Sequence, residues 1–139
     1  MKRTLMAAAL VCLVPFANAA DKAAFVPAGD LKWQDVPDAK GVQIAAVPGH
    51  GDPGKGASHF FLKFAPGFSA PVHHHTSNHY VTVVSGTLVL TVDGKDHKLP
   101  AGSFFWSWGK QPHATRCDAG ADCVLAMDVR GKWDVVAPK

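Results

Sequence analysis

Residues 67–86 read GFSAPVHHHTSNHYVTVVSG, and four of the chain's eight histidines lie within seven positions of this stretch. They are His73, His74, His75 and His79. A glycine bounds the stretch at each end, and residues of high β-propensity follow the last histidine. Imidazole is a common ligand of transition metals in proteins, so the stretch is the first candidate for a functional site.

Strand geometry separates the three consecutive histidines. Successive side chains of a β-strand point to opposite faces, so His73 and His75 share one face and His74 points to the other. A turn at residues 76–78 can then bring His79 back beside the pair. If the shared face is the interior of a barrel, these imidazoles converge there, and each needs a metal or a polar partner.

A fourth imidazole reaches this site only if a distant strand delivers it. His113 follows Pro112, whose fixed φ stiffens the approach, and it precedes a short run that reads as a strand. The alternative is a surface histidine cluster, or adventitious metal binding by the run of three histidines. The residues alone leave both interpretations open.

The chain outside this stretch is rich in residues that form short strands and turns. Its 139 residues amount to one domain, with a hydrophobic fraction of 47%, 13 glycines and 10 prolines. We find no convincing amphipathic helix after the first twenty residues. Turn-bounded runs predict about ten strands, at 31–35, 42–47, 59–64, 71–75, 79–84, 87–92, 95–99, 103–108, 114–117 and 123–129. The expected fold is all-β, an antiparallel barrel or sandwich.

The first nineteen residues predict a signal peptide rather than part of the fold. Lys2 and Arg3 give a positive start, an apolar run follows over 5–16, and small residues stand where a signal peptidase reads. A membrane anchor would need a longer apolar run. We expect cleavage after Ala19 or one residue later, and a periplasmic or secreted mature protein. The predicted organisation is a signal peptide over 1–19 and a single domain over 20–139, with a barrel core at about 42–129.

The charge of the predicted mature chain is close to neutral. The sequence carries 14 basic and 11 acidic residues, and removal of Lys2 and Arg3 leaves 12 against 11, a net charge near +1. This balance argues against nucleic acid, and against an anionic membrane surface, as a partner of the mature form. All 11 acidic residues are Asp, so the chain contains no Glu.

Two cysteines remain after removal of the signal peptide. Cys117 and Cys123 flank a short loop that contains a glycine. In an oxidising compartment such a pair predicts a disulfide, with a modest entropic gain of about 2–3 kcal/mol because the loop is short. The alternative is a pair of thiolate metal ligands, although the spacing is not Cys-x-x-Cys.

An aromatic strand and a single tryptophan stand out in the second half of the chain. Phe104, Trp106 and Trp108 alternate along one predicted strand, and we expect them in the core or in the wall of a pocket. The alternative is a stacking platform for an aromatic or sugar substrate. Trp133 lies in a tail without strand pattern and is expected to dock on the barrel.

The histidine stretch resembles the first conserved motif of the cupin superfamily. That motif reads Gly, five residues, His, one residue, His, three or four residues, Glu, six residues, Gly. Gly67, His73, His75 and Gly86 are in register with it, and His79 stands where the family has Glu.

A degenerate second cupin motif follows. Gly102 and His113 are in register, whereas Trp108, Lys110 and Cys117 replace its Pro, Gly and Asn. The leading stretch, with its Gly-rich loop near residue 50, also resembles small bacterial cupins. These include relatives of the zinc-binding cupin half of ChrR-type anti-sigma factors.

The resemblance implies a double-stranded β-helix, or jelly-roll, barrel with one metal ion. It implies that His73, His75 and His113 are metal ligands, with His79 as the fourth ligand in place of Glu. The expected cofactor is one divalent transition metal among Zn, Fe, Mn, Cu and Ni. Four neutral imidazoles would leave the full charge of the ion in place, which strengthens a Lewis acid, and they remove the usual carboxylate base.

Two functions remain open under this resemblance, and no catalytic residue is identified. The first is a small-molecule metalloenzyme, dioxygenase-like or hydrolytic, with an open coordination position on the metal. The second is a non-catalytic periplasmic cupin that binds or senses a metal or a ligand. In both cases the expected partner is a small molecule, and the resemblance makes a homodimer an expectation.

Overall fold

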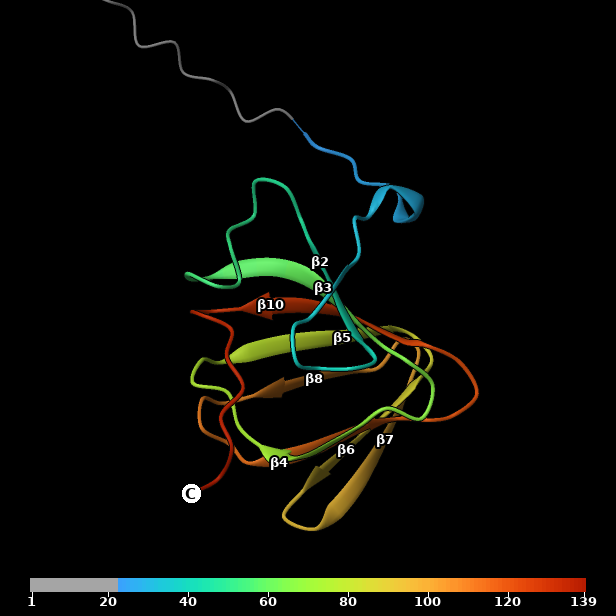
Figure 1. Cartoon of the computed structure of the whole chain (residues 1–139), viewed down its shortest axis with the longest axis vertical. Coiled ribbons are helices and arrows are strands. Elements are labelled where there is room, and N and C mark those ends of the chain that lie inside the picture. Colours follow the sequence, from blue (N-terminus) through green and yellow to red (C-terminus); the bar gives the residue numbers. More distant parts are fainter. Residues whose placement is uncertain (1–22) are drawn as a thin grey trace, which may run out of the picture.

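A computed structural model describes residues 23–139 as ten β-strands and one short 3-10 helix (Figure 1). The predicted signal peptide lies outside these residues. No helix in the described part of the chain is long and apolar enough to cross a membrane. The elements are η1 (Ala28–Asp30), β1 (Gln34–Asp35), β2 (Val42–Ala46), β3 (Ser58–Phe64), β4 (Ser69–His73), β5 (His79–Ser85), β6 (Thr87–Val92), β7 (Lys95–Pro100), β8 (Phe104–Ser107), β9 (His113–Cys117) and β10 (Cys123–Val129).

The strands form two sheets that face each other (Figure 1). One sheet has six strands in the order β1-β2-β3-β10-β5-β8, and the other has four in the order β4-β9-β6-β7. Every paired neighbour is antiparallel, and strands distant in sequence, such as β3 and β10, lie side by side. The predicted fold class, an all-β jelly roll, is confirmed.

The core lies between the two sheets, as strand alternation predicts. Phe60, Leu62 and Phe64 on β3 point inward and are buried. Neighbouring strands supply matching apolar side chains, so the six-stranded sheet presents a largely hydrophobic inner face. Members of this core outside β3 include Val81, Val83, Leu88, Leu125, Met127 and Val129. Each large buried side chain contributes about 1.5–3 kcal/mol through removal of apolar surface from water.

The predicted disulfide is confirmed. Cys117 at the end of β9 and Cys123 at the start of β10 are bonded, with an S–S distance of 2.10 Å. Both cysteines are buried, and the bond joins the strand that carries His113 to a central strand of the other sheet.

The turn between β5 and β6 requires a glycine, Gly86. Its φ is +75°, a left-handed conformation that side chains disfavour. A Cβ at this position would lie 2.4 Å from the carbonyl oxygen of Asp122 and 2.9 Å from the Cα of Cys123. The tight turn into β6 therefore packs directly on the disulfide loop.

The prediction for the aromatic strand β8 was wrong. Phe104, Trp106 and Trp108 are 55%, 55% and 57% exposed. Pairing with β5 sets the register, in which Trp106 lies opposite Tyr80 on the outer face and Ser107 lies opposite His79 on the inner face. Ser107 points inward because it pairs with the buried His79, and alternation along β8 then places Phe105 on the same inner face.

The tail after β10 turns back across the barrel. It runs from the end of β10 past the ends of β5 and β8 toward β4 (Figure 1). Its Val136 forms an isolated antiparallel bridge with His74, and Trp133 packs against the core. The expected docking of Trp133 is therefore observed, and its partners belong to the histidine cluster described next.

Candidate metal centre

Four buried histidines from three strands and one connection meet inside the barrel. His73 ends β4, His79 begins β5 and His113 begins β9, whereas His75 lies in the connection between β4 and β5. His74 points away from this group and is only partly buried. The sequence places all four in the barrel interior because each alternates with outward-facing neighbours.

Three of these histidines form a compact trio. The ligand atoms of His73, His75 and His113 all lie within 4.8 Å of one another. Their ring centroids are 4.9 Å apart for His73 and His75, 4.6 Å for His73 and His113, and 5.1 Å for His75 and His113. This arrangement is compatible with one metal ion held by three imidazoles.

His79 lies beside the trio but outside its tightest spacing. Its ring centroid is 4.9 Å from that of His75 and 6.1 Å from that of His113. Phe105 and Trp133 flank the ring, with centroids at 6.4 Å and 5.3 Å. The role of His79 as a fourth ligand therefore stays a prediction, whereas its place in the cluster is observed.

All four imidazoles bond a backbone carbonyl through Nδ1. A carbonyl oxygen can only accept, so Nδ1 carries the proton and donates it. The neutral ring then keeps its lone pair on Nε2, the atom available to a metal. The acceptors are the carbonyl oxygens of Pro71 for His73 (2.8 Å), Asp134 for His75, Ser77 for His79 (3.3 Å) and Gln111 for His113 (2.9 Å).

The electrostatics of the cluster favour neutral rings. Burial, and to a lesser extent the neighbouring imidazoles, lower the pKa of His75 to about 3, although its hydrogen bond to the carbonyl of Asp134 acts in the opposite direction. Burial likewise lowers the pKa of His113 to about 4, and it lowers the pKa of His79. Because a metal binds only the unprotonated imidazole, neutral rings fit a divalent ion near neutral pH. The choice among metals is not set by these residues.

The cluster forms part of the wall of a cavity of about 780 Å³. All four histidines contact it, and most of the remaining wall is apolar. Thr115 is the one buried hydroxyl-bearing side chain in that wall over residues 23–139, and it lies on β9 two residues after His113. Apolar members of the wall include Leu62, Phe64, Leu88, Leu90, Phe105 and Met127. A small, largely apolar molecule could therefore reach the histidines from within the barrel.

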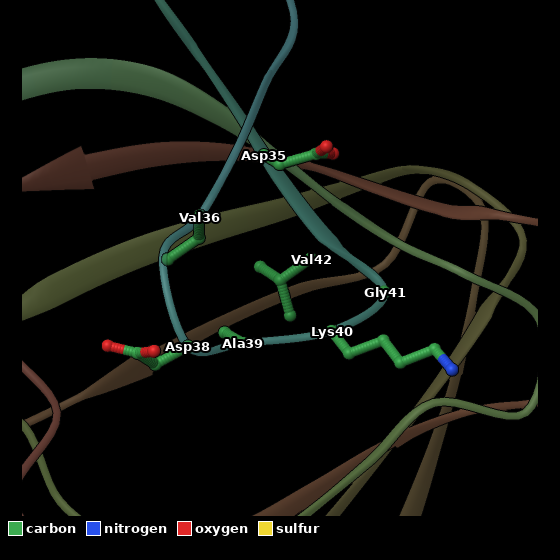
Figure 2. A pocket seen from close by; sticks show the side chains of 7 residues that line it. All are labelled: Asp35, Val36, Asp38, Ala39, Lys40, Gly41 and Val42. Carbon is green, nitrogen blue, oxygen red and sulfur yellow. The ribbon is translucent and has the colours of Figure 1, made fainter.

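The loop between β1 and β2 lines another part of the same cavity. A second hollow of about 450 Å³ lies along this loop, and no histidine lines it. Figure 2 shows that Asp38 and Lys40 extend from the loop in opposite directions. Val36 and Ala39 of the loop pack on the core. Polar groups at this part of the cavity therefore come from Asp35, Asp38 and Lys40 and not from the histidine cluster.

A family model for the Cupin domain matches residues 60–129, just over half of the chain. The chain belongs to the cupin family. The matched region contains both histidine motifs, the disulfide and every strand from β3 onward except the first residues of β3. A search of the curated proteins returns no significant match.

Several solved structures share this fold at low sequence identity. KdgF from Halomonas sp. is 22% identical, with a TM-score of 0.62, over 78% of this chain and 94% of that chain. The polyketide cyclase RemF from Streptomyces resistomycificus is 21% identical, with a TM-score of 0.69, over 85% and 87%. A chain of the Rhodobacter sphaeroides complex of SigE with the anti-sigma ChrR is 21% identical, with a TM-score of 0.59, over 74% and 51%. These similarities establish the fold of the cupin and not its activity.

Sequence reasoning did not identify two features of the site. The carbonyl of Asp134 accepts the Nδ1 proton of His75 from 59 positions away, and the indole of Trp133 covers the same ring. The other missed residue is Thr115, which shares the inward face of β9 with His113. Alternation from His113 could have indicated Thr115. No side-chain pattern indicates a backbone acceptor.

Proposed function

We propose that this protein is an exported mononuclear metal-binding cupin that acts on a small molecule. It uses His73, His75, His79 and His113 to hold one divalent transition metal. The reaction is dioxygenase-like or hydrolytic. The observation that carries this proposal is the group of buried imidazoles, with Nε2 free, in the wall of an apolar cavity.

The chemistry of the donor set supports a Lewis-acid role. A bound divalent ion would polarise an oxygen atom of the substrate, and four neutral ligands would leave its full charge to do so. The chain has no Glu, and the carboxylate of Asp134 is already bonded to Thr76 outside the cavity. Asp35 at the end of β1 and Asp38 on the loop that follows also line the cavity, but both are exposed. Among the described residues, the buried wall beside the histidines therefore offers no carboxylate base, which favours reactions that need little proton transfer from the protein.

The cavity wall indicates the class of substrate. Apolar side chains would bind a hydrocarbon or aromatic body, and the buried polar side chains among the described residues of the wall are the histidines and Thr115. Residues two apart on a strand lie about 6.5–7 Å apart, so Thr115 could bond a second oxygen at about that distance from the histidine end. We infer a compact molecule with one oxygen donor for the metal and a second polar group for Thr115.

A non-catalytic binding or sensing cupin is the second candidate. The described residues place no buried carboxylate beside the histidines. This favours binding without turnover, because the site lacks an obvious group to accept a proton from a substrate. The fold similarity to the complex that contains the anti-sigma ChrR is compatible with this candidate. In this candidate four histidines would close the coordination sphere and leave no position for a substrate.

Metal content tests the proposal. The untagged mature protein should carry about one transition metal per chain by elemental analysis, and the His75→Ala variant should carry much less. His97→Ala is the control, because His97 lies on the surface of β7. A wild-type protein without stoichiometric metal after mild purification would overturn both candidates.

Azide separates the two candidates. The protein loaded with Co²⁺ should change its visible absorption spectrum when azide is added if a coordination position is open. A spectrum insensitive to azide would contradict the enzyme and support the closed binding site. Export has a separate test, since the protein recovered from the periplasm or medium should begin near Ala20.

A further inference from the structure

We propose that the C-terminal strap, residues 130–136, positions His75 for the metal and is in turn locked in place by metal binding. This inference rests on the proposed metal site. It assigns a role to a segment that lies after the last strand and outside the matched family region.

His75 differs from the other three histidines in its Nδ1 partner. His73, His79 and His113 each donate to a carbonyl two positions earlier in the same segment, so their own strands orient them. His75 instead donates to the carbonyl of Asp134 in the strap, 59 positions later. Its ring orientation, and the direction of its Nε2, therefore depend on where the strap lies.

Trp133 gives the strap a second contact with the same ring. Its indole stacks on the imidazole of His75, with ring centroids 3.9 Å apart and planes 19° apart. The indole also forms T-shaped contacts with the rings of His79 and Phe60, at centroid distances of 5.3 Å and 5.7 Å. His75 is thus held by a hydrogen bond at Nδ1 and by a covering ring on one face, which restricts its rotation.

The strap is attached to the segment that carries His75 on both sides of that residue. Before it, the amide of Val136 donates to the carbonyl of His74 at 2.9 Å, and the amide of His74 donates in return at 3.0 Å. After it, the backbone amide and hydroxyl of Thr76 donate to the carboxylate of Asp134, at 2.8 Å and 2.6 Å. Further bonds join the strap to the rest of the chain: the hydroxyl of Ser77 donates to the carbonyl of Lys132. The amides of Trp133 and Arg130 donate to the carbonyls of Pro53 and Asn78.

These contacts couple the strap to the metal. A docked strap lowers the cost of ordering His75, so it strengthens metal binding. By linkage, a bound metal favours the docked strap by the same factor. Partners of ligating histidines typically change metal affinity by 10–100-fold when they are removed, which sets the size of the expected effect.

Substitutions in the full mature protein test the first half of the coupling. Trp133→Leu and Thr76→Val should each weaken Co²⁺ binding about 10–100-fold in competition with a chelator, and should alter the Co²⁺ absorption bands. Thr76→Val changes no charge, so its effect cannot arise from long-range electrostatics. Trp133→Phe keeps an aromatic ring on His75 and should restore most of the affinity and the wild-type spectrum.

Asp96→Asn is the matched control for Asp134→Asn. Asp96 also accepts a 2.6 Å bond from a threonine hydroxyl, that of Thr91, and a 2.8 Å bond from Arg116, but it lies on β7, outside the cluster of four buried histidines. Both substitutions remove one negative charge and weaken one such bond. Only Asp134→Asn should weaken Co²⁺ binding, and equal affinities for the two variants would overturn the role of the strap.

Hydrogen exchange tests the second half of the coupling, in which bound metal stabilises the docked strap. Addition of Zn²⁺ should slow exchange of the Val136 amide, which bonds His74, at least about tenfold more than exchange of amides in the β6–β7 hairpin. Equal slowing in both places would show general stabilisation and would overturn the coupling. A wild type that takes up no metal would contradict the proposed function. Normal metal uptake by wild type, with the same affinity in the strap variants, would contradict only the role of the strap.

Discussion

His73 and His113 face each other across two paired strands, with ring centroids 4.6 Å apart and planes 61° apart. The register of β4 and β9 pairs these two positions directly, after an irregularity between Ala70 and His73. Hydrogen bonding of the backbone therefore sets the spacing of two donors before an ion binds. The trio is completed by His75, which follows His73 after one outward residue.

Loss of either paired histidine should abolish tight metal binding. His113→Ala should weaken Zn²⁺ affinity by more than about 100-fold. Loss of a residue that only hydrogen-bonds a metal ligand already lowers metal affinity by about 10–100-fold, and loss of a ligand should lower it more. Chelator competition measures this affinity. His97→Ala, an exposed substitution on β7, should bind as wild type does. Tight binding by His113→Ala would contradict the assignment of the trio.

Substitutions at His79 should show whether it is the fourth ligand. His79→Glu restores the residue that the family has at this position and should keep one metal per chain, because a carboxylate also binds divalent ions and cancels one unit of charge. His79→Gln provides only a weak neutral ligand and should lose about tenfold or more in affinity. Wild-type affinity in His79→Gln would leave a site of three histidines.

The metal-free protein should lose stability as the pH falls below the ordinary pKa of histidine. The folded-state pKa values of His75 and His113, about 3 and about 4, lie below the ordinary value of 6.5. Between these limits the unfolded chain binds protons that the folded chain excludes, so the free energy of unfolding decreases as pH falls. The slope is about 1.4 kcal/mol per pH unit for each such histidine.

Urea unfolding of chelator-treated protein measures this slope. Between about pH 6.5 and pH 5, the free energy of unfolding of His113→Gln should fall less steeply with decreasing pH than that of wild type. The slope should be smaller by about one proton, because Gln does not bind a proton in the unfolded chain. An unchanged slope in this variant would show that His113 does not exclude a proton in the folded state.

Gly86→Ala should destabilise the fold more than Gly94→Ala. Both glycines have a φ of +75°, so both substitutions carry the left-handed backbone cost of about 1–2 kcal/mol. A Cβ at Gly86 also meets the backbone of the disulfide loop, whereas no atom lies within 4 Å of a Cβ at Gly94. Overpacking should add about 1–3 kcal/mol at Gly86 in denaturant unfolding. Equal losses would contradict the close approach.

Reduction of the disulfide should weaken the fold without removing the metal. Cys117 and Cys123 close a loop with a sequence separation of 6, for which the loss of loop-closure entropy predicts about 2 kcal/mol. Unfolding with and without a phosphine reductant measures the difference. Metal content should stay unchanged, because neither sulfur belongs to the trio.

Strand alternation predicted the parts of the fold in which hydrophobicity and register agree. On β3 the inward set Phe60, Leu62 and Phe64 is the more apolar one, so the sequence identifies the buried face. On β8 the outward set is the more apolar one, because Ser107 points inward opposite His79. Hydrophobicity therefore selects the wrong face of β8, and only the pairing with β5 corrects it.

The role of the strap could not be predicted for a different reason. Its main contact with His75 is made by the carbonyl of Asp134, and every residue has such a carbonyl. The trio was indicated by residue type and spacing, whereas this acceptor has no signature in the sequence. The indole of Trp133 was the only visible sign that the tail docks on the barrel.

The long-range origin of the site has a consequence for the order of events in the cell. His73 meets His113 only when β4 pairs with β9, and His75 meets its carbonyl across 59 positions. An unfolded chain therefore holds no such site, so metal loading has to follow closure of the barrel. If the predicted signal peptide carries the chain across the membrane unfolded, the ion is acquired after transport. The metal supply outside the cytoplasm would then decide which ion is bound.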